Sequence, residues 1–268
     1  MALTVTILGC GSSGGVPRPG SGWGACDPKN PKNRRRRCSI LVERSSPEGA
    51  TSLIVDTTPD LREQLIDAGI MHLDAVLFTH DHADHTHGID DMRALVLHMR
   101  RRIPVYADDV TAATLLSRFG YIFETPPGSL YPPILEMRPL ELDRPLKLDG
   151  VGGAIVAEPI ALEHGPGYRA LGFRFGSLAY VPDVSFIPPE AKAALAGLDV
   201  LILDCLRDSP HPSHFNLTEA LEAIAELKPR RAVLTDLHID LDYVSLTKRL
   251  PAGIEVAFDG MEIAVEDA

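Results

Sequence analysis

Short apolar runs separated by turn-forming residues dominate the chain, and this pattern predicts β-strands. Residues 3–8 alternate apolar and hydroxyl side chains, which indicates a first strand. Further strands are predicted at residues 38–43, 52–55, 75–78, 103–107, 153–162, 171–175, 177–181, 200–203 and 231–235. The segment 9–24 is rich in glycine and proline, so it is either a plain crossing loop or a loop whose backbone N–H groups hold an anion.

Apolar residues at helical spacing predict helices between several of these strands. Leu61, Leu65 and Ile66 form one such stripe, and Thr58-Pro59 supplies a hydroxyl cap and a proline at the first helical position. Other helices are predicted at residues 89–102 and 111–119 and from about residue 217, whereas the proline-rich segment 125–139 is predicted to be irregular. Because no repeat or linker interrupts the pattern, we expect a single domain over residues 1–268.

Composition and charge narrow the classes of function. The 268 residues include 45% hydrophobic and 24% charged side chains, which is ordinary for a globular protein. The net charge of −11 argues against a general nucleic-acid binder, which would carry a basic face. The basic run at residues 32–37 is a local exception. Arg34 to Arg37 could contact a phosphate, but a solvated face is the simpler interpretation.

The sequence carries no targeting signal that we can identify. Its start lacks the basic segment of a signal peptide, and no apolar run approaches the length of a membrane span. We therefore expect a cytoplasmic protein without a membrane partner. Four irregularly spaced cysteines do not form a disulfide framework.

The strongest chemical signal follows the apolar run at residues 75–78. His80, His82, Asp84 and His85 lie within six residues of one another. Two histidines spaced by two residues point to the same side of an extended chain, and the next two residues of the motif can face a neighbouring point. Imidazole and carboxylate together suit divalent ions such as zinc and manganese. The motif therefore predicts a metal site.

Later strands also deliver acidic or imidazole side chains just past their ends. His164, Asp183, Asp204 and Asp236 each follow a predicted strand, and His238 lies two residues beyond the last of them. Because strand ends on one rim of a sheet can converge on one point, we expect some of these side chains to join the same site.

The pattern His-x-His-x-Asp-His resembles the signature of the metallo-β-lactamase superfamily. The resemblance implies an α/β fold, the four-layer αββα sandwich, with a hydrolytic site for one or two metals at the edge of its two sheets. It also implies that Asp56, which ends a strand, orients ligand histidines. The order of ligands in the superfamily implies that one ion is held by His80, His82 and His164, that Asp183 bridges two ions, and that Asp84, His85 and His238 hold the second.

The last ligand is open between two residues. The superfamily usually places its final histidine directly after the strand, where this chain has Asp236. Asp236 and His238 lie on the same side of an extended chain, so either could reach the metal. We predict His238 because imidazole is the commoner ligand.

Two bridged cations imply a specific chemistry. Zn or Mn ions sharing a water lower its pKa toward neutrality, so hydroxide is the expected nucleophile and no side-chain nucleophile is needed. The segment between residues 204 and 217, with the Gly-rich first loop, resembles the phosphodiesterase branch and its phosphoribosyl cyclic phosphodiesterases. In that branch a histidine before a helix assists at the phosphate, and His214 matches it. Asp84 and His214 are therefore the predicted catalytic residues.

One departure from that branch puts the substrate in doubt. The related enzymes hold a structural zinc through clustered cysteines, but only Cys26 stands in the corresponding loop here, so we predict no structural zinc. We expect a small cyclic or nucleotide-like phosphate ester as substrate. The alternatives are a tRNA 3′-end processing nuclease, a thioester or lactone hydrolase, and a non-catalytic accessory protein of a cofactor pathway. A homodimer is one assembly that the sequence allows.

Overall fold

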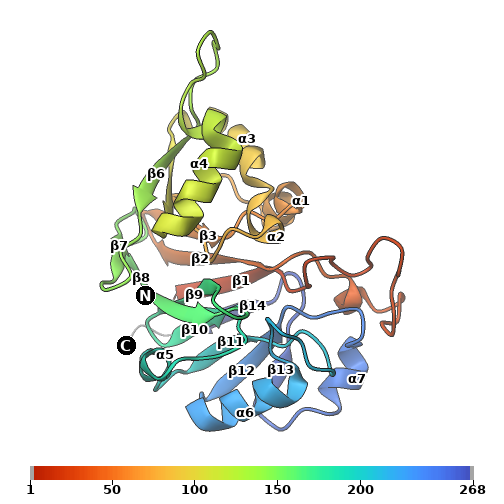
Figure 1. Ribbon diagram of the computed structural model, residues 1–268. Helices are drawn as coiled ribbons and strands as arrows, with labels where there is room; N and C mark the ends of the chain where they lie inside the picture. The colour runs from red at the N-terminus through yellow and green to blue at the C-terminus, as the bar shows by residue number, and fades with distance from the viewer. Residues whose placement is uncertain (1–2, 266–268) are drawn as a thin grey trace.

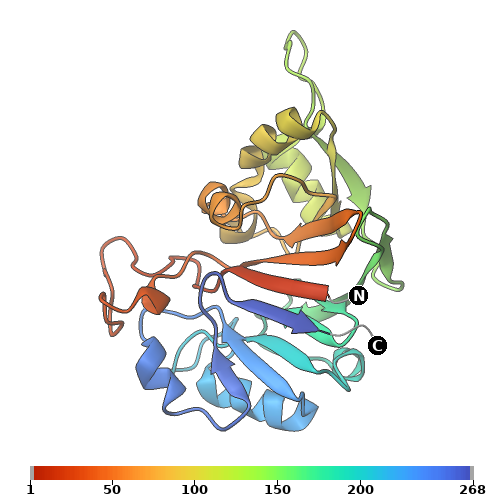
Figure 2. The same cartoon turned by 180° about the vertical axis from the view of Figure 1, so that it is seen from behind.

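The structure, a computed structural model, describes residues 3–265. Met1 and Ala2, which belong to the segment predicted to lack a signal peptide, lie outside the described residues. Two seven-stranded sheets pack face to face, and helices cover the outer face of each (Figures 1 and 2). This is the αββα sandwich, so the predicted fold class is confirmed.

The first sheet has the strand order β14-β1-β2-β3-β4-β5-β6. It consists of β1 (Leu3–Gly9), β2 (Ser39–Ser46), β3 (Gly49–Val55), β4 (Ala75–Leu77), β5 (Ile103–Ala107), β6 (Leu135–Pro139) and β14 (Glu262–Val265). From β3 to β6 the strands are parallel, and parallel neighbours need crossover connections. The crossovers contain α1 (Leu61–Asp67), α2 (Ala83–Thr86), the 3₁₀ turn η2 (Ile89–Asp91), α3 (Met92–Met99) and α4 (Asp109–Phe123).

The second sheet has the strand order β13-β12-β11-β10-β9-β8-β7. It consists of β7 (Leu146–Leu148), β8 (Ile155–Glu163), β9 (Arg169–Phe175), β10 (Leu178–Val181), β11 (Val200–Asp204), β12 (Arg231–Thr235) and β13 (Ile254–Val256). From β10 to β13 the strands are parallel. The connections after β10 contain α5 (Pro189–Ala194), α6 (Leu217–Leu227) and α7 (Tyr243–Thr247), and the first loop contains the turn η1 (Pro31–Asn33).

Successive side chains of a strand point to opposite faces of its sheet, so the buried side chains of the first sheet belong to two cores. One core lies between the two sheets and the other lies between the first sheet and its helices. In β3, Leu53 and Val55 point into the core between the sheets, where Phe173 of the second sheet also packs. Ile54, between them, faces the opposite way and packs with Phe78 beneath the first helical layer. Because successive side chains in a strand point to opposite faces, a strand covered on both sides is apolar throughout.

Three details differ from the sequence predictions. α1 begins at Leu61, because the Thr58 hydroxyl accepts a hydrogen bond from the Asp60 N–H (3.1 Å) in a turn before the helix. Ile66 is 57% exposed and does not belong to the buried stripe. The segment predicted to be irregular contains β6, which tolerates Pro139 because it is an edge strand.

Most of the arginine run is structural rather than a solvated face, so that interpretation was wrong. Arg35 is 2% exposed, and its Nη2 donates to the Leu241 carbonyl at 2.8 Å. Arg36 pairs with Asp259 and Arg37 with Asp60, each at 3.1 Å. These contacts attach the first loop to segments far along the chain.

We expect Arg35→Ala to lower the free energy of unfolding by about 2–4 kcal/mol, because buried carbonyls including that of Leu241 would lose a charged donor. Equilibrium unfolding in urea measures the change. The neighbouring Arg34 is exposed, so Arg34→Ala should change stability by no more than about 0.5 kcal/mol. Equal effects of the two variants would contradict the structural role.

Across residues 3–265, helices that combine the length and the apolarity needed to traverse a bilayer are absent.

Candidate metal centre and active site

The histidine motif occupies the turn after β4 and the short helix α2. The rings of His80 and His82 lie 4.5 Å apart between centroids, consistent with side chains on one side of the chain. α2 carries Asp84 and His85, and Asp84 Oδ2 lies 3.5 Å from His85 Nε2. The sequence motif therefore places four candidate ligands around one region.

Asp56 fixes the orientation of His85. It follows β3 with a φ of 69°, in the left-handed region that non-glycine residues rarely adopt. Its carboxylate accepts hydrogen bonds from the Thr79 N–H and hydroxyl, both at 2.8 Å, and from His85 Nδ1 at 2.7 Å. Because Nδ1 is the donor, Nε2 of His85 is directed toward the site as a free acceptor.

The second sheet contributes His164 and Asp183 from the ends of β8 and β10. His164 Nδ1 donates to the Ser213 carbonyl at 2.6 Å, so its Nε2 faces His82 Nδ1 at 3.3 Å and Asp183 Oδ2 at 3.5 Å. The other oxygen of Asp183 lies 3.3 Å from His85 Nε2. The Asp183 carboxylate therefore lies between the His164 side and the His85 side of the cluster.

Two carboxylates, those of Asp204 and Asp236, lie beside His214, which precedes α6. His214 Nδ1 lies 2.9 Å from Asp204 Oδ2 and 3.2 Å from Asp236 Oδ2, and its Nε2 lies 3.9 Å from Asp183. Burial alone would lower the pKa of His214, but the Asp204 and Asp236 carboxylates outweigh it and raise this pKa to about 10. Burial also raises the pKa of Asp204, to about 6, against the effect of His214.

The structure separates the two candidates for the last ligand. Asp236 follows β12 with a φ of 58°, and this conformation directs its buried carboxylate into the cluster with His214 and Asp204. His238 lines the same cavity, but its Nε2 contacts an Arg18 Nη1, and its Nδ1 lies 2.9 Å from Asp240. Asp236 forms a group of mutually close ligand atoms with Asp204 and His214, and the described residues form no such group around His238. Which of the two residues holds a metal stays a prediction.

The residues present fit divalent cations. Within the described part of the chain, the buried atoms in and beside the cluster that lack a hydrogen-bond partner include His80 Nε2, Asp183 Oδ1, Asp204 Oδ1, Asp236 Oδ2 and His238 Nδ1. A buried polar atom without a partner costs about 1–3 kcal/mol, and divalent cations would satisfy those that face the site. Burial, aided by the nearby His85, holds the pKa of His80 well below its usual value, so the ring is in the neutral form that binds metals.

A model of the β-lactamase superfamily domain matches residues 51–239, which is more than half of the chain. The chain belongs to the metallo-β-lactamase superfamily. The crystal structure of a new diphosphatase from the PhnP family superposes with a TM-score of 0.87 at 36% identity, covering 99% of this chain and 98% of that one. This similarity puts the chain in the phosphodiesterase branch of the superfamily, and it supports a metal-dependent hydrolase.

Other relatives in the superfamily vary in length and similarity. An octanoyltransferase of Porphyromonas gingivalis is 31% identical over 97% of this chain, but the chain spans only about half (51%) of that protein. Coenzyme PQQ synthesis protein B of Methylobacterium nodulans is 30% identical, with 75% of this chain and 72% of the relative covered. The Zn²⁺-bound PqqB of Methylobacterium extorquens superposes over 97% of this chain and 99% of that one, at a TM-score of 0.70 and 20% identity, which shows the fold alone.

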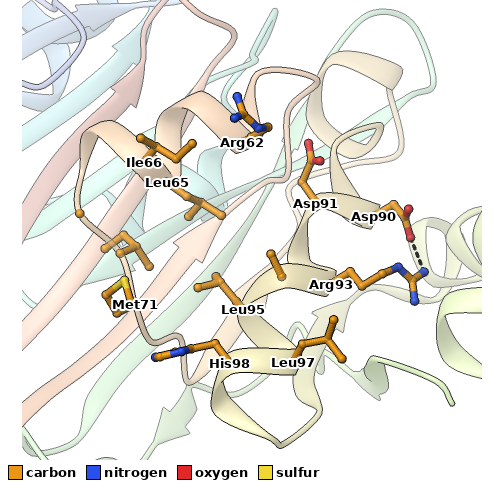
Figure 3. Close-up of a pocket in the computed structure, with 13 residues that line it drawn as sticks. Arg62, Leu65, Ile66, Met71, Asp90, Asp91, Arg93, Leu95, Leu97 and His98 are labelled. Atoms are coloured by element: carbon orange, nitrogen blue, oxygen red, sulfur yellow. Dashed lines mark hydrogen bonds and ion pairs between the residues drawn. The ribbon is translucent and has the colours of Figure 1, made fainter. Parts of the chain in front are cut away.

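The superfamily site opens into a polar cavity of about 330 Å³, which His82, Asp84, Asp183 and His214 line. A larger hollow, of about 760 Å³, lies elsewhere, between α1 and α3, and its walls are mainly apolar (Figure 3). Among the described residues, those that line this larger hollow form no group of converging ligand atoms. The smaller cavity is therefore the candidate active site of this superfamily member.

Sequence reasoning missed three residues of the superfamily site. The Tyr168 ring stacks on His82, with centroids 4.8 Å apart and planes 13° apart, and its hydroxyl donates to Asp81. Arg18 and Arg207 line the cavity. None lies directly after a strand or forms a spaced pattern with the ligands, so spacing offered no signal for them. The glycine-rich character of the first loop was the only indication that its residues approach a ligand.

We expect Asp236→Ala to weaken the binding of one metal ion by at least about tenfold, because outer partners of metal ligands already contribute 10–100-fold. His238→Ala should keep the metal content of the wild type, since its imidazole is held by other side chains. Elemental analysis after dialysis against a series of buffered zinc concentrations compares the two. Loss of metal from the His238 variant alone would reverse the assignment.

Proposed function

We propose that this protein is a dinuclear metal-dependent hydrolase of small phosphoric esters or anhydrides, acting on a cyclic or nucleotide-like phosphate. The observation that carries the proposal is the set of buried, unpartnered ligand atoms beside His214. The similarity to a PhnP-family diphosphatase supports phosphorus as the attacked atom.

The side chains divide into two ligand sets that share one residue. His80, His82, His164 and Asp183 would hold the first Zn or Mn ion. Asp84, His85 and Asp183 would hold the second, with Asp236 as its proposed last ligand. When bound, such ions supply Lewis acidity toward a phosphoryl oxygen and lower the pKa of water. Asp183 belongs to both ligand sets, so the binding of both ions would depend on its carboxylate.

His214 would act on the leaving group. Its Nδ1 donates a hydrogen bond to Asp204 at 2.9 Å, which orients the ring so that Nε2 lies on the side of Asp183. A protonated Nε2 can donate to the leaving oxygen or to a phosphoryl oxygen, as general acid or as a fixed hydrogen-bond donor. Asp84 also lines the cavity and stays a predicted catalytic residue as well as a ligand.

Activity assays with added Zn or Mn test the proposal. We expect turnover of bis(p-nitrophenyl) phosphate or of a cyclic ribose phosphate, and no faster hydrolysis of a glutathione thioester or a lactone. Preferred cleavage of a tRNA precursor would favour the nuclease alternative, which the net charge of −11 opposes. Metal binding without turnover of any substrate would favour the accessory-protein alternative. A cytoplasmic location and a homodimer stay predictions.

A further inference from the structure

A second polar region lines the candidate active-site cavity beyond the ligands. Arg18 and Ser12 come from the glycine-rich first loop, and Arg207 comes from the segment after β11. The Ser12 hydroxyl is buried, 2% exposed as a residue, and within residues 3–265 it lacks a hydrogen-bond partner. A buried hydroxyl without a partner beside a cavity indicates a group that a ligand completes.

The backbone of the first loop fixes Arg18 over this region. Arg18 and Gly22 exchange backbone hydrogen bonds of 2.9 and 2.8 Å, which close the loop. The Arg18 guanidinium lies over Gly14, where an added Cβ would come within 2.6 Å of it, so a larger residue at position 14 would displace the guanidinium. His238 Nε2 accepts from Arg18, and the Asp240 carboxylate lies 2.9 Å from the opposite ring nitrogen. His238 is therefore a positioning residue for Arg18.

Arg207 is held without a neutralising partner. Its Nε donates to the Ser209 carbonyl at 3.2 Å and its Nη2 to the Pro210 carbonyl at 2.8 Å. Among the described residues, neither this guanidinium nor that of Arg18 forms an ion pair with a carboxylate. Two positive charges without an ion-pair partner line a cavity of about 330 Å³. The low-dielectric walls of a cleft concentrate the electric field of such charges, which favours the binding of an anion.

We propose that Ser12, Arg18 and Arg207 bind a second phosphate-type group of the substrate, next to the phosphorus that is attacked. This inference rests on the proposed function and narrows it, from phosphoric esters in general to substrates with two phosphate groups. Guanidinium groups match phosphate oxygens in a planar, two-pronged geometry, and the serine hydroxyl adds a donor. The cavity volume suits a small molecule of this size.

Calorimetry on the metal-loaded protein tests the subsite with two probes that resist hydrolysis, methylenediphosphonate and methylphosphonate. We expect wild type to bind the diphosphonate at least about tenfold more tightly, and Arg18→Ala or Arg207→Ala to abolish most of that preference. Arg18→Lys should restore only part of it, because lysine lacks the planar fork. The matched control is Arg144→Ala, which removes an exposed arginine paired with Glu141.

Equal affinity of wild type for the two probes, or an equal loss for both in the Arg18 variant, would overturn the subsite. Metal content and thermal unfolding are measured for each variant, so a folding defect is recognised. The probes are bound and not cleaved, so calorimetry tests the subsite independently of catalysis. A protein that is inactive on phosphoric esters would contradict the proposed function, whereas the binding preference would still show whether the subsite exists.

Discussion

Asp183→Ala should lower kcat/KM by about a thousandfold or more and reduce metal binding at both ions. Its two carboxylate oxygens face the His164 side and the His85 side of the cluster at 3.5 and 3.3 Å, so it is the residue that the two proposed ligand sets share. Lewis-acid stabilisation by a metal contributes several kcal/mol to the transition state, and about 4 kcal/mol corresponds to a thousandfold in rate. Steady-state kinetics with measured zinc content checks the result.

A stability measurement separates lost metal from lost fold in the Asp183 variant. Chelation should lower the free energy of unfolding of wild type by about 2.7 kcal/mol for each ion present at a hundred times its dissociation constant. The Asp183 variant should show almost none of this change. Asp149→Ala removes an exposed aspartate paired with Lys147 and should behave as wild type. A variant that keeps two ions per chain would show that Asp183 is not shared.

His214→Ala should lower kcat by about 10²–10⁴-fold while both metal ions stay bound. The expected loss is that of a general acid or fixed donor, because Nδ1 is hydrogen-bonded to Asp204 and Nε2 lies on the side of Asp183 in a residue that lines the cavity. Kinetics on substrates with good and poor leaving groups checks the role, since a nitrophenolate needs less protonation than an alkoxide. The variant should therefore lose less activity on the nitrophenyl ester.

The matched control for that experiment is His98→Ala. His98 is exposed on α3 and lines the apolar hollow between α1 and α3, away from the ligands (Figure 3). If His214→Ala lost metal in proportion to activity, His214 would be a ligand and not a proton donor. If both leaving groups suffered equally, hydrogen bonding to a phosphoryl oxygen would be its role.

The sequence predicted the parts of this site that depend on local geometry. His80, His82, Asp84 and His85 lie together because a strand, a turn and one helical turn leave few other arrangements. His164 and Asp183 follow strands of the second sheet, and parallel strand ends meet at one rim. The spacing left the choice between Asp236 and His238 open, because it does not reveal the positive φ of Asp236.

Residues of the first loop were beyond prediction for a different reason. The position of Arg18 depends on a loop closed by Gly22 and on His238, which lies 220 residues away in sequence. Arg35 is likewise buried by the Leu241 carbonyl from the far end of the chain. Side chains whose partners come from distant loops carry no periodic signal, so composition alone made the arginine run resemble a solvated surface.

The pairing of β1 with β14 has a consequence for longer proteins. Leu3 lies opposite Val265, so the two ends of the sandwich emerge side by side (Figure 1). Ser12, which lines the cavity, follows the opposite end of β1, a strand of seven residues that spans about 23 Å. Extra polypeptide joined at either terminus would therefore leave from the end of this strand that is remote from the cavity.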